Sequence, residues 1–328
     1  MLKFLSFLLL LAVIAASAVY VILYRPYGPS TETFVDIPTG TSTVGIAKLL
    51  QQNGILRSAY ALDLLHAAKP GTLKAGEYRF DHPAPPAEIY ARLVKGDVFT
   101  LTISVPEGFN LFDIAAAVQA AGLGPAPAFL AAAQQHTELI ALYSPHAASL
   151  EGYLFPDTYH FSRHATPLQI LTTMTHRFRT AAVQLDLTGD IARTVTMASL
   201  VEKEVSQDSE RPLVAGVFVN RLAQNIPLAT DPTVIYAALL ENRYRGTIYA
   251  SDLKSPSPYN TYLHTGLPPG PICSPGLAAL RAAIHPAHTD YLYFVADAQG
   301  HSRFASTLKE HSQNVQQYRA AEHAAGRR

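Results

Sequence analysis

The chain has 328 residues and a formal net charge of zero, and it carries no basic stripe that would point to nucleic acid as a partner. Its single cysteine, Cys273, excludes an intrachain disulfide and argues against a cysteine-rich zinc site. The 13 histidines are scattered, without an HExxH or His-x-His pattern, so we expect no metal centre. This length allows a membrane segment and two or three domains.

An apolar run from Phe4 to Tyr24 begins the chain and has the length of one transmembrane helix. Lys3 precedes the run and Arg25 follows it. A cleavable signal peptide is the alternative, because Ala16-Ser17-Ala18 resembles a cleavage site. The run continues past that site, which favours a signal anchor. Either interpretation exports the rest of the chain.

The next segment has the pattern of a small α+β module. After a polar linker, the sequence predicts a strand, two helices and a second strand at residues 34–38, 44–53, 58–68 and 75–80. Ser42 or Thr43 would cap the first helix, and Gly54 would end it. A third helical pattern, residues 87–95, closes at Gly96. The order strand, helix, helix, strand resembles a LysM-like carbohydrate-binding unit, and a generic α+β module is an equal alternative.

Residues 98–145 are interpreted as a second small unit or a connector. Residues 98–105 alternate as a strand, and alanine-rich helical stretches follow at residues 111–121 and 125–134. The segment after them, EGYLFPDTY at residues 151–159, is rich in aromatic residues with Gly and Pro punctuation. It is either a packed turn or a rim on which sugars stack.

The stretch Met197 to Arg211 predicts one helix, because strong helix formers dominate it and no Gly or Pro interrupts it before Pro212. At about 100° per residue, its apolar side chains gather in one arc, and Glu204 falls inside that arc. A carboxyl group among apolar neighbours loses hydration, which raises its pKa and prepares it as a general acid. Glu202 lies at the margin of the arc, where we expect a surface or supporting contact. The alternative is that both glutamates belong to a solvated charged turn without a catalytic role.

Two later segments concentrate hydrogen-bonding side chains. LATDPTVIY, residues 228–236, predicts a turn into a helix that Thr230 or Asp231 would cap. YNTY, residues 259–262, precedes a loop from Gly266 to Gly276 that is too rich in Pro and Gly for mere connection. A rigid loop can pre-organise polar contacts to a ligand. We expect this loop to border a ligand cleft together with Thr230, Asp231, Asn260, Thr261 and Tyr262.

Taken together, six segments resemble the YceG-like family of endolytic murein transglycosylases: EGYLFPDTY, MASLVEKE, SERPLVAGVFVNRL, LATDPTVIY, SPYNTYLHTGLPPGPICSPG and HPAHTDYLYFVAD. The resemblance covers about Phe34 to Tyr318 and fits the N-terminal anchor and the LysM-like module. The family's catalytic glutamate is the second one in its EKE motif, which is Glu204 here. Val205 stands where family members often carry Thr, a departure that leaves the glutamate intact.

The resemblance implies an enzyme that cuts the β-1,4 bond between N-acetylmuramic acid (MurNAc) and N-acetylglucosamine (GlcNAc) inside peptidoglycan glycan strands. The product carries a 1,6-anhydro-MurNAc end, so the enzyme is a lyase, and it needs no metal or organic cofactor. The resemblance also implies control of glycan length and coupling to peptidoglycan synthases. A muramidase-type hydrolase using Glu204 with Asp231 or Glu151, and a non-catalytic peptidoglycan-binding scaffold, are the alternatives.

We therefore expect an α+β fold: an N-terminal transmembrane helix, a small LysM-like α+β module and a mixed α+β catalytic domain with the catalytic glutamate on a helix. The expected boundaries are 1–24 for the cytoplasmic tip and anchor, 25–32 for the linker, 33–97 for the LysM-like module, 98–145 for the connector, 146–320 for the catalytic domain and 321–328 for the tail. The chain would cross the bacterial inner (plasma) membrane once, with its catalytic domain in the periplasm or outside the cell. The expected substrate-binding residues are Glu151, Asn220, Thr230, Asp231, Tyr236, Asn260, Thr261 and Tyr262.

Overall fold

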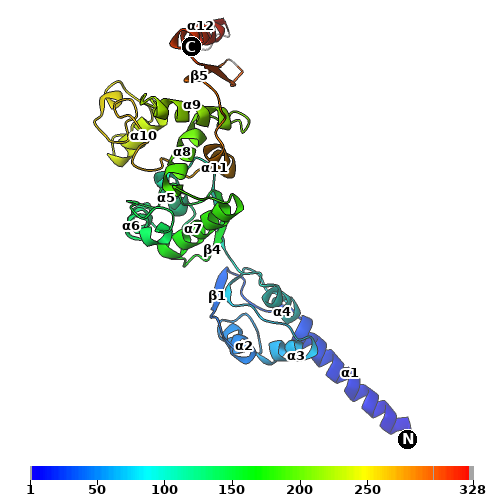
Figure 1. Cartoon of the computed structure of the whole chain (residues 1–328). Coiled ribbons are helices and arrows are strands. Elements are labelled where there is room, and N and C mark those ends of the chain that lie inside the picture. Colours follow the sequence, from blue (N-terminus) through cyan, green and yellow to red (C-terminus); the bar gives the residue numbers. More distant parts are fainter. Residues whose placement is uncertain (1, 298, 325–328) are drawn as a thin grey trace. The chain divides into compact units, whose positions relative to one another are not determined.

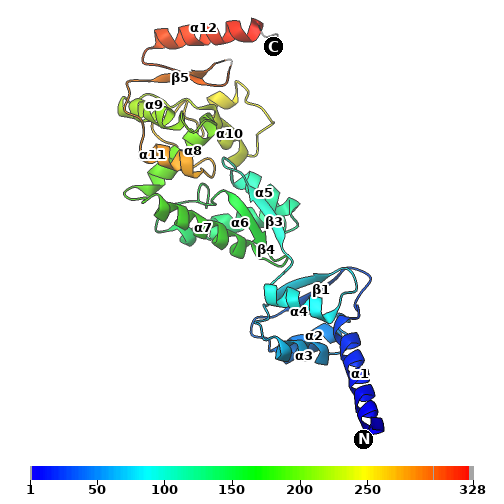
Figure 2. The same ribbon diagram turned by 90° about the vertical axis from the view of Figure 1, so that its right-hand side faces the viewer.

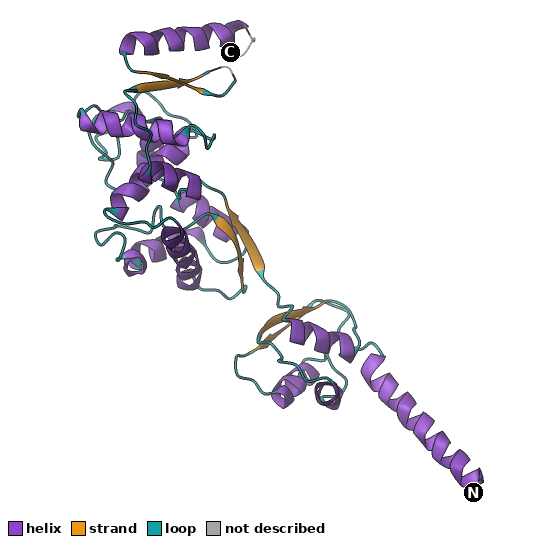
Figure 3. Cartoon of the chain, turned by 45° about the vertical axis from the view of Figure 1, so that its right-hand side comes forward, coloured by secondary structure: helices purple, strands orange, loops and turns teal. Residues whose placement is uncertain are grey.

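The computed structural model describes residues 2–297 and 299–324 (Figure 1). The chain divides into two compact units, residues 1–101 and residues 102–328. The described residues form three two-stranded sheets, and helices make up most of the remaining regular structure (Figure 3). This composition confirms the expected mixed α+β class with an apolar helix at the N-terminus. The finer domain boundaries stay predictions.

The first element is α1 (Leu2–Tyr24), a helix of 23 residues. Its span from Phe4 to Tyr24 is long and apolar enough to cross a membrane, and none of it is buried inside the structure. Phe4 and Leu9 are 67% and 68% exposed. A helix that is apolar on all sides and unburied by protein is stable in lipid rather than in water.

The first unit packs helices against one antiparallel pair of strands. β1 (Thr33–Ile37) pairs with β2 (Gly76–Phe80). In the sequence, the two strands are separated by α2 (Thr43–Gln52) and α3 (Tyr60–Ala68). The Ser42 hydroxyl caps α2 by accepting from the Gly45 amide at 3.2 Å. α4 (Pro86–Lys95) ends at Gly96, whose φ of 77° favours glycine. The predicted order strand, helix, helix, strand is confirmed.

The second unit begins with a pair of strands distant in sequence. β3 (Leu101–Val105) pairs with β4 (Asp157–Phe161), so the segment 98–145 shares a sheet with the region that follows it. Three α-helices and a short 3₁₀ helix pack nearby: α5 (Leu111–Ala120), α6 (Ala126–Gln135), η1 (Thr137–Ile140) and α7 (Pro167–Gln184). Asn110 caps α5 by accepting from the amides of Phe112 and Asp113.

The core of the second unit surrounds α8 (Ile191–Glu204), which contacts α9 (Arg211–Ala223), α10 (Asp231–Leu240) and α11 (Leu277–Ile284). A short 3₁₀ helix, η2 (Asp252–Lys254), follows α10. The predicted single helix through Arg211 is wrong, because α8 ends at Glu204. Val205 is extended (φ −139°, ψ 137°) and only 9% exposed, so the chain leaves the helix as this side chain enters the core.

The C-terminal part of the second unit is a hairpin followed by a helix (Figure 2). β5 (Tyr293–Ala296) pairs antiparallel with β6 (Ser302–Ala305), and α12 (Leu308–Ala324) contacts both strands. Each strand of this hairpin has only four residues. α12 also runs past residue 320, the expected end of the catalytic domain. Of the predicted tail, residues 321–324 belong to α12 and residues 325–328 lie outside the described residues.

Candidate functional site

Glu204 is the last residue of α8, and its half-buried side chain faces a pocket of about 400 Å³. Five regions of the second unit meet there: the end of α8, α9, the start of α10, the loop holding Tyr262, and the C-terminal hairpin with α12. The lining residues are Glu204, Arg221, Leu228, Ala229, Thr230, Asp231, Tyr262, Tyr293, Phe294, Leu308 and His311.

The surroundings of Glu204 favour its protonated form. Burial is the main cause that raises the pKa of Glu204 to about 7, and the negative charge of Asp231 adds to the rise. The positive charge of Arg221 opposes both effects. A carboxyl group with this pKa can give up a proton and take one back near neutral pH, as general acid and base catalysis requires.

Asp231 and Tyr262 form a hydrogen-bonded pair at the edge of the pocket. The Tyr262 hydroxyl donates to Asp231 Oδ1 at 2.7 Å. Both residues are exposed, which leaves them accessible to a ligand. Behind them, the Tyr262 amide donates to Asn260 Oδ1 at 3.0 Å. The structure thus brings three expected substrate-binding residues to Glu204: Thr230, Asp231 and Tyr262.

Arg221 is a lining residue that the sequence did not single out for the site. Its Nε donates to the Leu292 carbonyl at 2.6 Å, and its Nη1 donates to the carbonyls of Pro227 and Leu228 at 3.1 and 2.9 Å. Its guanidinium also lies 5.1 Å from the ring centroid of Tyr293. Arg221 therefore fixes two backbone segments of the pocket wall and contributes a positive charge. The sequence signal that could have identified Arg221 is the polar pair Asn220-Arg221 inside the otherwise apolar run VFVNRL.

Thr230 occupies the N-cap position of α10, but its side chain makes no capping hydrogen bond. The Thr230 amide instead donates to Thr261 Oγ1 at 3.1 Å. Thr233 Oγ1 lies 2.9 Å from the same Thr261 oxygen. Thr230 therefore has the expected N-cap position, but the expected side-chain capping bond is not formed. Thr261 is 1% exposed and supports the pocket from behind.

Two expected substrate-binding asparagines hold backbone segments. Asn260 is completely buried, and its amide nitrogen donates to the carbonyls of Leu253 and Ser255 at 3.0 and 2.8 Å. The Asn220 amide nitrogen donates to the carbonyls of Thr289 and Tyr291 at 2.8 and 2.9 Å. Asn260 thereby shapes the loop that carries Tyr262, and Asn220 fixes the segment that leads into β5.

Glu151 and Tyr236 lie together in the interior and not in the wall of the Glu204 pocket. Glu151 is 4% exposed, accepts from the Leu111 amide at 2.9 Å and bonds to the Tyr236 side chain. Burial raises the pKa of Glu151 to about 7. The first five residues of EGYLFPDTY are buried, as in a packed turn. Glu151 also lines a second cavity of about 440 Å³, together with residues 269–271 of the Pro/Gly loop.

Glu202 makes a buried ion pair rather than a surface contact. Its carboxylate lies 2.8 Å from Arg211 Nη1, and each side chain is only 5% exposed. Glu202 also accepts from the Gly276 amide at 2.9 Å, which ties the end of the Pro/Gly loop to α8. The loop's Ile272 amide donates to Ser199 Oγ at 3.1 Å. Cys273 is buried in this loop, and burial raises the pKa of its thiol well above the usual value, so it is unreactive.

Sequence reasoning missed the contribution of the C-terminal hairpin and helix to the site. Tyr293 and Phe294 come from β5, and Leu308 and His311 come from α12. The segment HPAHTDYLYFVAD contributed to the family resemblance, but none of its residues was predicted to line the site. No local pattern indicates that residues about 100 positions after Glu204 return to it. Among the residues that the structure describes, no group of His, Cys, Asp and Glu side chains could hold a metal ion.

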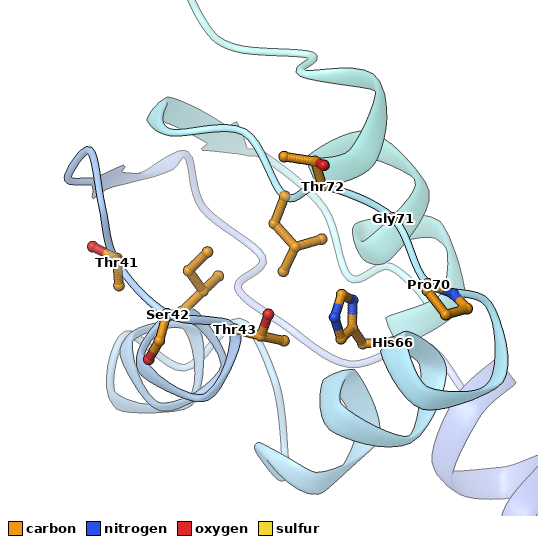
Figure 4. Close-up of a pocket in the computed structure, with 9 residues that line it drawn as sticks. Thr41, Ser42, Thr43, His66, Pro70, Gly71 and Thr72 are labelled. Atoms are coloured by element: carbon orange, nitrogen blue, oxygen red, sulfur yellow. The ribbon is translucent and has the colours of Figure 1, made fainter.

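The first unit has a pocket of its own, with a volume of about 580 Å³ (Figure 4). It lies between the turn after β1 and the loop that connects α3 to β2. His66 belongs to this pocket, and its Nδ1 lies 3.2 Å from the Tyr90 hydroxyl. The labelled lining residues are Thr41, Ser42, Thr43, His66, Pro70, Gly71 and Thr72.

Comparison with known proteins identifies the class to which this fold and pocket belong. The model of the YceG-like family matches residues 35–317, so the chain is a member of the YceG-like family. A Bacillus subtilis protein named endolytic murein transglycosylase is 33% identical over 309 residues, which is 88% of this chain and 85% of that protein. A Streptococcus pneumoniae protein with the same name is 31% identical, and the match spans 95% of this chain and 64% of that protein.

A solved structure agrees with this membership. The crystal structure of a YceG-like protein from Listeria monocytogenes is 30% identical in sequence and superposes with a TM-score of 0.56. The match covers 87% of this chain and 99% of that chain. The resemblance inferred from the six sequence segments is thereby confirmed.

Proposed function

We propose that this chain is an endolytic lytic transglycosylase that cuts the β-1,4 bond between MurNAc and GlcNAc inside peptidoglycan glycan strands. The observation that carries the proposal is Glu204, a half-buried carboxyl group with a pKa raised to about 7 that faces an open pocket. The names of the Bacillus and Streptococcus relatives support murein as the substrate.

One carboxyl group can serve both halves of this reaction. Protonated Glu204 gives its proton to the glycosidic oxygen as the bond from that oxygen to C1 of MurNAc breaks. The resulting carboxylate then takes the proton of the C6 hydroxyl of the same MurNAc, whose oxygen attacks C1. The product is a 1,6-anhydro end, and no water is consumed. Ordinary glycosidases need a second carboxyl group, either as a nucleophile or to activate water.

The proposed substrate-binding residues fall into two groups by position. Thr230, Asp231 and Tyr262 contact the glycan directly, because they line the pocket with Glu204. The remaining five act by holding the backbone and the core around that pocket. They are Glu151, Asn220, Tyr236, Asn260 and Thr261.

The proposed location is the bacterial inner (plasma) membrane, with α1 as an uncleaved anchor and the catalytic domain on the outer side. In this proposal residues 33–97 form a LysM-like module, and its pocket between Ser42 and Gly71 binds the glycan strand. Cleavage beside the membrane would end strands as they are made, next to peptidoglycan synthases. N-terminal sequencing of the purified protein tests the anchor, since a mature chain starting near Val19 would show cleavage.

The decisive experiment is mass spectrometry of the products that the purified full-length chain releases from isolated glycan strands. We expect 1,6-anhydro-MurNAc ends, and these must be missing from the Glu204→Gln variant. Reducing ends would show a hydrolase instead, with Asp231 as its natural second carboxylate because its charge already acts on Glu204. A Glu204→Gln variant that retains full cellular function would favour a scaffold.

A further inference from the structure

The wall of the Glu204 pocket contains two buried polar atoms without hydrogen-bond partners. They are Thr230 Oγ1 and His311 Nδ1, and neither finds a partner within residues 2–297 and 299–324. Thr230 is only 4% exposed. Buried polar atoms in native proteins are almost always paired, so two orphans in one pocket wall indicate that a ligand completes them.

The imidazole of His311 is held in place by its neighbours. Its ring stacks on Tyr293, with centroids 5.2 Å apart and an interplanar angle of 20°. Tyr293 also contacts the Arg221 guanidinium, which three backbone carbonyls hold in place. His311 is therefore pre-organised, and binding a ligand would cost little side-chain entropy.

Burial and one nearby positive charge favour the neutral form of His311. Burial and the positive charge of Arg221 lower the pKa of His311 below its usual value. Glu204, Asp231, Tyr262 and Tyr293 are the other titratable groups that line the same pocket. A neutral imidazole offers one donor and one acceptor, and a threonine hydroxyl offers both roles as well. The matching ligand groups are uncharged and both donate and accept, as sugar hydroxyls and acetamido groups do.

We infer that His311 and Thr230 bind hydroxyl or acetamido groups of an N-acetylated sugar and hold it beside Glu204. This inference rests on the proposed function and adds a substrate contact from α12. Proton transfer stays with Glu204. The two residues orient the sugar whose glycosidic oxygen receives the proton.

The test measures binding of peptide-free GlcNAc–MurNAc glycan strands by calorimetry, using the full-length chain in detergent. All variants carry Glu204→Gln, so that the strands are bound without being cut. His311→Leu and Thr230→Val remove the hydrogen-bonding groups, whereas His311→Asn and Thr230→Ser keep one near the same place. His288→Ala is the control, because His288 is exposed and outside the pocket.

We expect His311→Leu and Thr230→Val each to raise the dissociation constant about 5- to 10-fold, which corresponds to one lost hydrogen bond. His311→Asn and Thr230→Ser should recover part of that loss, and His288→Ala should bind as its parent does. Unchanged dissociation constants in the Leu and Val variants would overturn the inference. The inference would also be overturned if His311→Asn lost as much affinity as His311→Leu, and Thr230→Ser as much as Thr230→Val. Packing alone would then explain the losses.

A kinetic measurement separates this inference from the proposed function. With Glu204 restored, His311→Asn and Thr230→Ser should raise KM more than they lower kcat, and the alkaline limb of the pH profile should stay in place. An effect on kcat alone would contradict a role in binding the sugar. If the unmodified chain forms no anhydro ends, the proposed function fails whatever the binding data show.

Discussion

Glu202 and Arg211 form an ion pair of 2.8 Å in which each side chain is only 5% exposed. Glu202 starts from the last turn of α8, and Arg211 is the first residue of α9. Glu204, two residues further along, forms no ion pair within the described part of the chain and faces the pocket instead. The chain therefore places Glu202 where it holds α8, α9 and the end of the Pro/Gly loop together, and Glu204 where it can exchange a proton.

Glu204→Gln should abolish formation of anhydro ends while the protein stays folded. General acid and base catalysis contributes about 10²- to 10⁴-fold, and a group that serves both steps should lie at the upper end. The measurement is the rate of product formation on isolated glycan strands. An active Glu204→Gln variant beside an inactive Glu202→Gln variant would move the catalytic assignment to Glu202.

Arg211→Met should destabilise the protein strongly, because it leaves Glu202 buried without a counter-charge. Breaking a buried ion pair by removing one partner costs about 3–5 kcal/mol. The free energy of unfolding from denaturant titration gives the value, with Arg193→Met on the exposed side of α8 as the matched control. Equal stability of the two variants would show that the pair contributes nothing. Of the surface or supporting contact that the sequence indicated for Glu202, the structure shows the supporting one.

The value of kcat/KM should fall as the pH rises through about 7, since the reaction begins with protonated Glu204. Asp231→Asn removes a negative charge that raises the pKa of Glu204. The alkaline limb of the profile should therefore move to lower pH in this variant. A limb that stays in place, measured on the same glycan strands, would show that Asp231 does not tune Glu204.

Glu204→Gln should also change how stability depends on pH. The pKa of Glu204 rises from 4.5 to about 7 on folding, so the folded state holds the proton more tightly than the unfolded chain does. The native protein therefore loses stability as the pH rises from about 4.5 through 7, and Gln does not. Thermal melting should show the variant as the more stable protein at pH 8, with little difference at pH 4. The reverse order would contradict the raised pKa.

Asn260→Ala should lower stability, because two backbone carbonyls lose their buried donor. An unsatisfied buried group costs about 1–3 kcal/mol. Tyr262→Phe is the contrasting variant: it removes only the exposed bond to Asp231 and should lower turnover with little loss of stability. Denaturant titration and turnover on both proteins check this. An Asn260→Ala variant that is as stable as the unmodified chain would contradict the role of Asn260 in holding the loop backbone.

Local sequence patterns were sufficient for most of the elements and for the catalytic candidate. A helix places residues by a fixed rotation, so the buried residues Met197, Leu200 and Val201 indicate the face of α8 from which Glu204 projects. The cap at Ser42 and the stop at Gly96 follow equally local rules. Predicting the apolar span of α1 requires only the length and composition of that segment.

Only the tertiary structure decided which polar residues face the pocket and which hold the backbone. Asn260 and Tyr262 are neighbours in one polar motif, yet one is completely buried and the other is 38% exposed. Glu202 meets Gly276 across 74 positions of sequence, and His311 reaches the pocket through the packing of α12 on β5. No local period encodes such contacts, because they form only when distant segments fold onto one core.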